Sequence, residues 1–137
     1  MTLHFGFFEN FSGSDSLLIW GDAEELTNLH ILFGEFAKGK RNAASLNEMP
    51  WAESVDGTLV NLQCVSDRDQ GIDAHETATR RVINWRCSAG QFAEFENKVA
   101  VLIVPMSKAG HHYLDQSGDQ PIQIIVSQGE YPPNFGQ

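Results

Sequence analysis

The segment from residue 22 to residue 39 constrains the fold of this chain more strongly than any other stretch of its sequence. Asp22 suits a helix N-cap, and Glu25, three positions later, completes a capping box, in which each of two residues bonds the backbone N–H of the other. Gly39 stands where a left-handed C-terminal cap is expected. Between the caps, apolar residues recur at helical spacing at Leu26, Leu29, Phe33, Phe36 and Ala37. The pattern predicts an amphipathic helix that buries one face against the rest of the protein.

A second helix is predicted to follow Ser88, which can cap it, with Gln91 in the capping-box position. Pro105 cannot continue a helix, so we expect this one to end near Val104. Its buried face would consist of Phe92, Phe95, Val99, Leu102 and Met106. The chain therefore has two helices, each with an apolar face that needs a packing partner.

Strands are predicted where apolar and polar residues alternate, or where short apolar runs lie between turn signals. They are residues 3–8, 16–20, 58–66, 81–87, 111–115 and 121–127, with 44–46 as a short edge strand. The polar segment 67–79 is interpreted as an exposed loop, so the strands on its two sides are expected to pair as a long-looped hairpin. Beyond Pro132 and Pro133, the last residues are expected to be loose.

The predicted elements follow the order ββα(β)ββαββ. Because hairpins favour antiparallel pairing and each helix follows a hairpin, we expect an α+β fold, with an antiparallel sheet of about six strands and both helices on one face. A chain of 137 residues suits one domain, and no linker-like segment interrupts it. Residues 1–137 are therefore predicted to form a single domain.

Acidic residues outnumber basic ones by 18 to 9, which gives a formal net charge of −9. Since affinity for nucleic acids comes largely from Lys and Arg that neutralise phosphates, binding to DNA or RNA is disfavoured. A basic protein partner is compatible with this charge. Surplus acidic charge on such a domain most often only keeps the protein in solution.

No apolar run approaches the ~18 residues of a membrane-spanning helix, so no membrane partner is expected. Residues 1–10 lack the basic start and the small-residue cleavage site of a signal peptide. We therefore expect a protein that stays in the cytoplasm.

The densest polar cluster is the segment 110–115. On a strand, His111, Tyr113 and Asp115 would share one face, where a His, a Tyr and a carboxylate can form an acid–base or metal site. This hypothesis describes a small enzyme or a ligand-binding protein. The alternative is a solvated sheet face, because the first and last residues of such a row are too far apart on an extended strand to hold one ion.

A second polar cluster, Asp73, His75 and Glu76, provides three potential metal ligands in the predicted loop. Loops rich in carboxylates are also common in acidic proteins, and no further ligand pattern accompanies these residues. The sequence contains none of the motifs G-x-S-x-G, G-x-x-x-x-G-K-[ST], G-x-G-x-x-G or H-E-x-x-H. No cofactor is therefore predicted, and metal binding by this cluster remains an alternative.

If both helices cover one face of the sheet, its other face carries amide, aromatic and Arg side chains of the kind found in protein interfaces. The predicted interface residues are Asn61, Gln63, Asn84, Arg86, His111, Tyr113 and Gln123. Such a surface suits a partner protein or a homodimer. The alternative is an ordinary antiparallel sheet with one solvated face.

Three further stretches carry a resemblance. They are residues 18–22 (LIWGD) running into the first helix through Leu26 and Leu29, residues 110–115 (GHHYLD), and residues 127–132 (SQGEYP). Together they cover less than half of the chain, and they resemble the small bacterial immunity-type proteins of polymorphic toxin systems, or uncharacterised relatives of these. The resemblance implies a non-enzymatic protein that binds and blocks a cognate toxin, often a basic nuclease. The sequence thus favours a protein-binding domain, with the small enzyme as the alternative.

Overall fold

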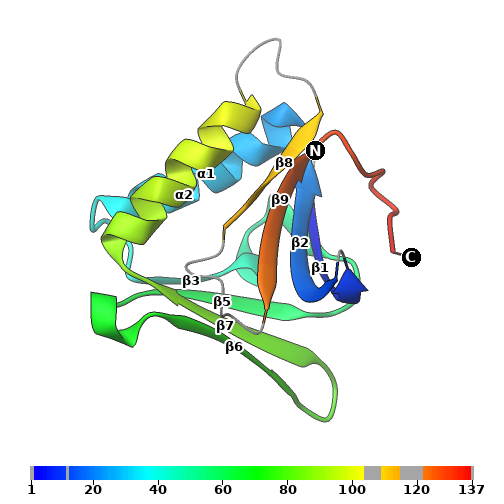
Figure 1. Cartoon of the computed structure of the whole chain (residues 1–137), viewed down its shortest axis with the longest axis horizontal. Helices are drawn as coiled ribbons and strands as arrows, with labels where there is room; N and C mark the ends of the chain where they lie inside the picture. Colours follow the sequence, from blue (N-terminus) through cyan, green and yellow to red (C-terminus); the bar gives the residue numbers. More distant parts are fainter. Residues whose placement is uncertain (1, 12, 104–108, 115–121, 137) are drawn as a thin grey trace.

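The computed structural model describes residues 2–11, 13–103, 109–114 and 122–136. The fold is α+β, as predicted, and has two helices and two mixed sheets of five and four strands (Figure 1). No helix in the described residues has the length and the apolar composition needed to cross a membrane. The prediction of one antiparallel sheet is wrong, and the difference lies in how the strands pair.

The five-stranded sheet, sheet A, has the strand order β4-β1-β2-β9-β8. Its strands are β1 (Leu3–Phe11), β2 (Ser14–Gly21), β4 (Ala52–Ser54), β8 (Gly110–Tyr113) and β9 (Gln123–Gln128). β1 and β2 form the predicted antiparallel hairpin, and β8 pairs antiparallel with β9. In contrast, β2 pairs in parallel with β9, and β1 in parallel with β4. The short strand β4 was not predicted.

The four-stranded sheet, sheet B, has the order β3-β5-β7-β6. Its strands are β3 (Ala43–Ser45), β5 (Leu59–Cys64), β6 (Gly71–Glu76) and β7 (Arg81–Cys87). β3 is the predicted short edge strand. β5 and β7 are parallel neighbours, so the predicted long-looped hairpin between them is wrong. The antiparallel partner of β7 is β6, which lies in the segment that was expected to be a loop. Parallel strands need a crossover connection, and β6 is part of it.

The first helix begins and ends as the sequence predicts. α1 (Ala23–Ala37) has the capping box: the N–H of Glu25 donates to Asp22 Oδ1 at 2.7 Å, and the N–H of Asp22 donates to Glu25 Oε1 at 2.9 Å. After the helix, Gly39 has a φ of 75°, in the left-handed region that a C-terminal cap requires. This agreement reflects signals that are local to the helix.

The second helix, α2 (Ala89–Ile103), starts after Ser88, whose Oγ accepts a hydrogen bond from the N–H of Gln91 at 3.1 Å. Its buried residues are the predicted Phe92, Phe95, Val99 and Leu102. Val104, Pro105 and Met106 lie outside the described residues. Two 3-10 helices, η1 (Leu46–Glu48) and η2 (Asp67–Asp69), lie in connections before β4 and β6.

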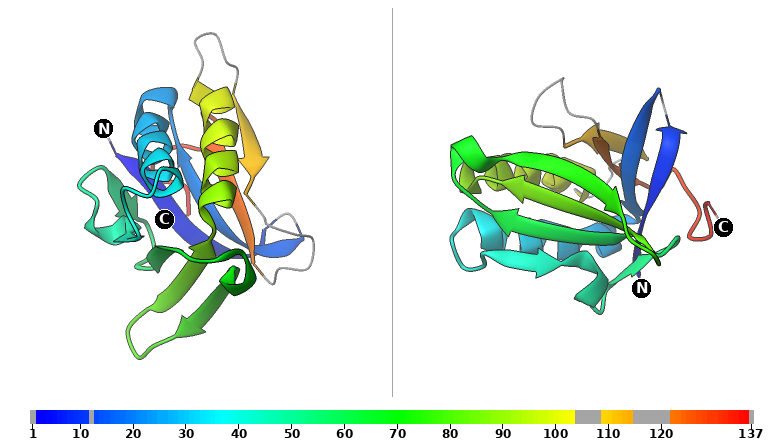
Figure 2. Two further views of the ribbon diagram at one scale, coloured as in Figure 1. Left: turned by 90° about the vertical axis from the view of Figure 1, so that its left-hand side faces the viewer. Right: turned by 90° about the horizontal axis from the view of Figure 1, so that it is seen from below.

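The two helices pack side by side in the angle between the two sheets (Figures 1 and 2). One core cluster contains residues from both sheets and both helices. It includes Leu17 from sheet A, Trp85 from sheet B, Phe33 from α1 and Phe95 from α2. The prediction that both helices cover one face of a single sheet is therefore wrong. They fill the space between the apolar inner faces of two sheets, which must both be buried.

The outer face of sheet A carries a second, smaller apolar cluster. Its buried residues are Leu18, Trp20 and Ile125. Residues 129–136, here called the C-terminal arm, run along this side of the sheet (Figure 1). Phe135 of the arm packs edge-on against Trp20, with ring centroids 5.9 Å apart, and Trp20 Nε1 donates to the carbonyl of Pro132 at 3.0 Å. The prediction that the last residues are loose is wrong, because the arm buries aromatic surface that the strands leave open.

Candidate functional site

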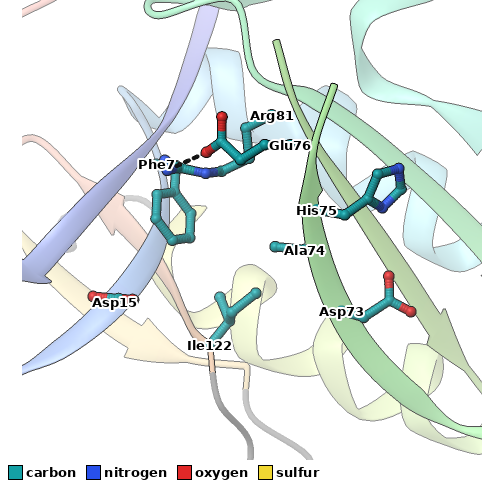
Figure 3. Close-up of a pocket in the computed structure, with 8 residues that line it drawn as sticks. All are labelled: Phe7, Asp15, Asp73, Ala74, His75, Glu76, Arg81 and Ile122. Carbon is teal, nitrogen blue, oxygen red and sulfur yellow. Dashed lines mark ion pairs between the residues drawn. The ribbon is translucent and has the colours of Figure 1, made fainter. Parts of the chain in front are cut away.

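A hollow of about 390 Å³ lies between the two sheets, where the β1–β2 hairpin approaches β6 and β7. It is lined by Phe7, Asp15, Asp73, Ala74, His75, Glu76, Arg81 and Ile122, and we call it the acidic hollow. Figure 3 shows Phe7, Asp15 and Ile122 on one side of it and the β6 residues on the other. Its volume is within the range of small binding pockets, and its lining mixes apolar and charged groups.

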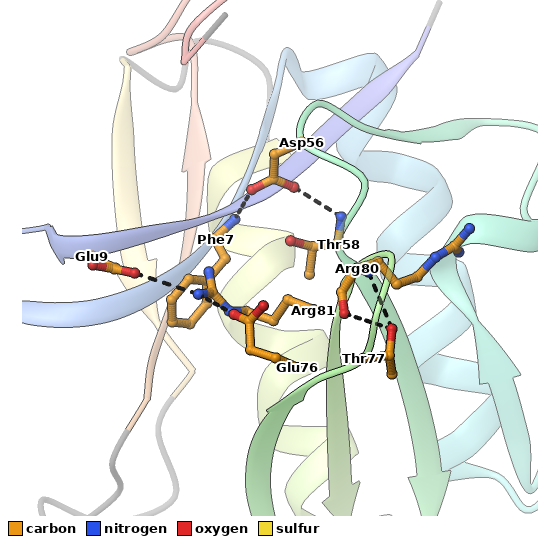
Figure 4. A network of polar contacts seen from close by, with 8 residues as sticks. All are labelled: Phe7, Glu9, Asp56, Thr58, Glu76, Thr77, Arg80 and Arg81. Carbon is orange, nitrogen blue, oxygen red and sulfur yellow. Dashed lines mark hydrogen bonds and ion pairs between the residues drawn. The ribbon is translucent and has the colours of Figure 1, made fainter.

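Arg81 connects the two sides of the acidic hollow. Its guanidinium carbon lies 4.0 Å from the centroid of the Phe7 ring, which is a cation–π contact. Its Nη2 is 2.6 Å from Glu76 Oε1 and 3.5 Å from Glu9 Oε1, so two carboxylates and one aromatic ring hold this guanidinium (Figure 4). Arg81 is therefore held at the hollow through both charge and ring contact.

Asp56 fixes the strand that carries Phe7. One of its carboxylate oxygens accepts a hydrogen bond from the N–H of Phe7 at 2.9 Å, and the other accepts one from the N–H of Thr58 at 3.0 Å (Figure 4). These bonds tie β1 of sheet A to the turn that leads into β5 of sheet B. The Phe7 side of the hollow is thus held in a set position relative to sheet B.

Carboxylates outnumber cations around the acidic hollow. Asp73 is paired with Arg86, whose Nη1 lies 3.0 Å from Asp73 Oδ2, and this hydrogen bond holds the pKa of Asp73 below its ordinary 3.8. Asp15 Oδ1 accepts a hydrogen bond from the N–H of Asn10 at 3.1 Å. Within the part of the chain that the structure describes, no cation forms an ion pair with Asp15. The hollow therefore retains negative charge that is available to a basic group.

The predicted metal ligands Asp73, His75 and Glu76 do not converge. Alternate residues of a strand point to opposite faces, so Asp73 and His75 share one face of β6 and Glu76 is on the other. In Figure 3 the side chains of Asp73 and His75 point away from the hollow, whereas Glu76 points into it. Among the described residues, no group of three or more His, Cys, Asp or Glu side chains is arranged to hold a metal ion.

The predicted acid–base residues His111 and Tyr113 are exposed on the outer side of sheet A, with stacked rings whose centroids are 5.7 Å apart. Asp115, the third member, lies outside the described residues. His111 instead contacts a carboxylate that the sequence did not suggest: its Nδ1 is 3.0 Å from Glu130 Oε1. The contact links β8 to the C-terminal arm.

Ser127 adds a hydroxyl to this contact, because its Oγ donates to Glu130 Oε1 at 2.6 Å. The carboxylate thus holds both the hydroxyl and the imidazole of His111. The Ser127 hydroxyl donates to Glu130 and not to His111, so these residues do not form the hydroxyl–imidazole–carboxylate series of a serine nucleophile. The three residues anchor the start of the C-terminal arm, where burial and the nearby charge of Glu130 also raise the pKa of Tyr131.

The predicted interface residues are divided between the two sheets. Asn61, Gln63, Asn84 and Arg86 lie together on the outer face of sheet B, where Asn61 is opposite Asn84 and Gln63 is opposite Arg86. His111, Tyr113 and Gln123 lie on the outer face of sheet A, where Gln123 Oε1 accepts a hydrogen bond from Ser16 at 3.2 Å. The prediction of one continuous surface is wrong because it assumed one sheet.

The residues of the acidic hollow come from four strands of two sheets and from Ile122, which directly precedes β9. Sequence reasoning singled out Asp73, His75 and Glu76. It missed the other lining residues, which are Phe7, Asp15, Ala74, Arg81 and Ile122. The acidic composition was the one sequence signal that pointed to such a site. Comparisons of the chain with protein-family models, curated proteins and solved structures found no match, so the function has to be argued from this geometry.

Proposed function

We propose that this protein is a non-enzymatic protein-binding domain that captures a basic segment of a partner protein at the acidic hollow. The observation that carries the proposal is the convergence of Asp15 from sheet A and Glu76 from sheet B on one hollow, whose Arg81 also lies 3.5 Å from Glu9. Residues so far apart in the sequence come together only in the folded chain. Their charge gives the hollow a preference for a cation.

The internal contact of Arg81 supports a basic partner in particular. Its guanidinium is bound by a ring and by carboxylates on the rim of the hollow. Asp15 and the second carboxylate oxygen of Glu76 offer the same chemistry to an Arg or Lys side chain from outside. A partner that supplied such a side chain would form charge-assisted hydrogen bonds at a partly enclosed site, where they are stronger than on an open surface.

The resemblance to immunity-type proteins suggests why the protein would bind a basic segment at the acidic hollow. The partner would be a basic toxin, such as a nuclease, whose cationic segment binds the acidic hollow and is blocked there. The overall charge of −9 would also accelerate the encounter with a basic protein. Such a protein would act in the cytoplasm and would need no cofactor.

The alternative, a small enzyme that uses His111, Tyr113 and Asp115, has less support. His111 and Tyr113 stand on an exposed face, and the carboxylate that His111 contacts also accepts the hydroxyl of Ser127. Among the described residues, Ser127 and His111 both contact Glu130 rather than each other, and this arrangement anchors the C-terminal arm. The geometry therefore supports binding better than it supports catalysis.

The test is a protection assay with a toxin-like domain, which we expect to be encoded beside this gene; a neighbourhood without one would count against the immunity role. The double variant Asp15→Asn/Glu76→Gln removes two charges of the hollow with little change in shape, and Asp15→Asn keeps an acceptor for Asn10. We expect it to bind the toxin about tenfold more weakly, which is about 1.4 kcal/mol, and to lose growth protection. Calorimetry at low and at high salt should show wild-type binding weakening with salt.

The matched control is Glu48→Gln/Glu94→Gln, which removes the same charge from two exposed carboxylates on η1 and α2. It should bind and protect like the wild type. Equal loss in both double variants would mean that only the net charge matters. Full protection by Asp15→Asn/Glu76→Gln would show that the acidic hollow is not the binding site.

A further inference from the structure

Strand β6 is the outermost strand of sheet B, and in the described part of the chain it pairs only with β7. An outermost strand has a row of backbone N–H and C=O groups that point away from the sheet and can pair with another chain. The other outermost strands are short: β3 and β4 have three residues each and β8 has four, whereas β6 has six. β6 therefore offers the longest open edge among the described strands.

Proteins commonly protect such edges with prolines, lysines or β-bulges. β6 has the sequence GIDAHE, which contains neither proline nor lysine, and its register with β7 is regular from Gly71 to Glu76. The edge of β8 is different, because Lys98 Nζ donates to the backbone carbonyl of Tyr113 at 2.9 Å. The open edge of β6 thus lacks proline, lysine and a bulge, and the charges that it carries, Asp73 and Glu76, are acidic and would repel an acidic strand but not a basic one.

The acidic hollow reaches the main chain of β6. Four consecutive residues of this strand, 73–76, line it. Since side chains alternate, one face of a strand would contribute only every second residue. Figure 3 shows Asp73 and His75 pointing away from the hollow, which leaves their main chain to border it. The hollow and the open edge are therefore parts of one surface.

We propose that β6 accepts an extended basic segment of the partner protein as a fifth strand of sheet B, with every second side chain of that segment entering the acidic hollow. The inference rests on the proposed function and specifies how the partner binds. In strand addition, main-chain hydrogen bonds provide much of the affinity and the pockets beside the edge select the side chains. Here the hollow would select Arg or Lys through Asp15 and Glu76, and Asp73 would face the alternate side chains.

Charge distinguishes this occupant from a second copy of the chain. Pairing β6 with β6 of another copy would bring Asp73 and Glu76 of both chains into one small sheet, and like charges across neighbouring strands are destabilising. Each copy also carries a net charge of −9. The same carboxylates that disfavour self-pairing attract a basic strand, so the edge discriminates between the two occupants.

The experiment uses the full chain and a blocked octapeptide of alternating arginine and valine as the probe. A second peptide has the same sequence but carries a methyl group on each central backbone nitrogen, so that it keeps the charge but cannot donate main-chain hydrogen bonds. We expect the methylated peptide to bind at least about tenfold more weakly, because several hydrogen bonds are lost at once. The unmethylated peptide should slow amide hydrogen exchange in residues 71–76 about tenfold. Asp15→Asn/Glu76→Gln should weaken its binding, and Glu48→Gln/Glu94→Gln should not.

Three results would overturn the inference. Equal affinity for both peptides, or no binding of either at millimolar concentration, would show that β6 does not add such a strand. A dimer that protects residues 71–76 without peptide would show that a second copy covers the edge. The toxin-protection assay judges the proposed function separately. If partner binding depends on Asp15 and Glu76 but peptide binding is insensitive to methylation, the proposed function holds and the strand addition does not.

Discussion

Asp22 illustrates how much of α1 depends on one side chain. Its carboxylate accepts the N–H of Glu25, which would otherwise have no partner within the helix. We expect Asp22→Ala to lower the free energy of unfolding by about 1 kcal/mol, as measured by urea denaturation. Asp22→Asn keeps the acceptor and should retain most of the stability. If Asp22→Ala is as stable as the wild type, the capping box does not stabilise the helix.

The pKa of Asp73 offers a second test at the scale of single residues. The hydrogen bond from Arg86 is the largest cause of its lowered pKa, followed by burial, which opposes it, and by the hydrogen bond from Asn84. Because the folded pKa is below the ordinary 3.8, the ionised form favours the folded state. This contribution is complete above pH 3.8 and is lost as the pH falls through the lower folded value. It should be small, since the Asp73 side chain is 52% exposed.

The measurement is an NMR titration of the Asp73 carboxyl carbon. Arg86→Gln should move the pKa of Asp73 up toward 3.8, and Asn84→Ala should move it up by less. If Arg86→Gln left the pKa where it is in the wild type, the ion pair seen on sheet B would not persist in solution.

At the scale of elements, the C-terminal arm makes the clearest prediction. The ring of Phe135 lies 5.9 Å from Trp20, 5.4 Å from Phe8 and 4.6 Å from Tyr131. We expect Phe135→Ala to cost about 1–2 kcal/mol, which is less than for a fully buried Phe because this ring is half-buried. Trp20 fluorescence should shift to the red as water reaches the indole. Asn134→Ala, at an exposed position of the arm, should change neither quantity.

The elements also show what a sequence can predict. The signals of α1 lie within the helix and its caps, so they could be recognised without knowledge of the rest of the chain. β6 buries only Ile72 and pairs through its backbone, which leaves an exposed polar pattern that resembles a loop. In the C-terminal arm, Pro132 and Pro133 suggested an end of order, but the burial of Phe135 depends on a sheet face built elsewhere. Elements fixed by distant contacts are the ones that were missed.

At the scale of the whole molecule, the pairing of distant strands decided both the fold and the site. β2 lies parallel to β9 although residues 22–122, nearly three-quarters of the chain, separate them, and adjacent hairpins were the default expectation. As a result, Asp15 and Glu76 face one hollow from two different sheets, which no spacing rule could reveal. The negative charge of the site was predictable from composition. Its position was not, because it requires the tertiary arrangement.

The shared core predicts that the two sheets unfold together, as a single domain should. Phe33 of α1 contacts Trp85 of sheet B at 5.9 Å and Phe95 of α2 at 5.9 Å, and the same cluster includes Leu17 of sheet A. Neither sheet can lose its inner face without exposing the helices that both sheets cover, so we expect one cooperative transition.

Variants that keep one tryptophan in each sheet test this cooperativity. One variant keeps only Trp20 in sheet A and the other only Trp85 in sheet B, with phenylalanine at the remaining tryptophans. In each variant, the urea midpoint from fluorescence should coincide with that from far-UV circular dichroism. Adding Phe33→Leu should lower both urea midpoints together, because it lowers the free energy of unfolding by about 1–2 kcal/mol. Separate midpoints would mean that the sheets are independent units, and the hollow between them would then open before the chain unfolds.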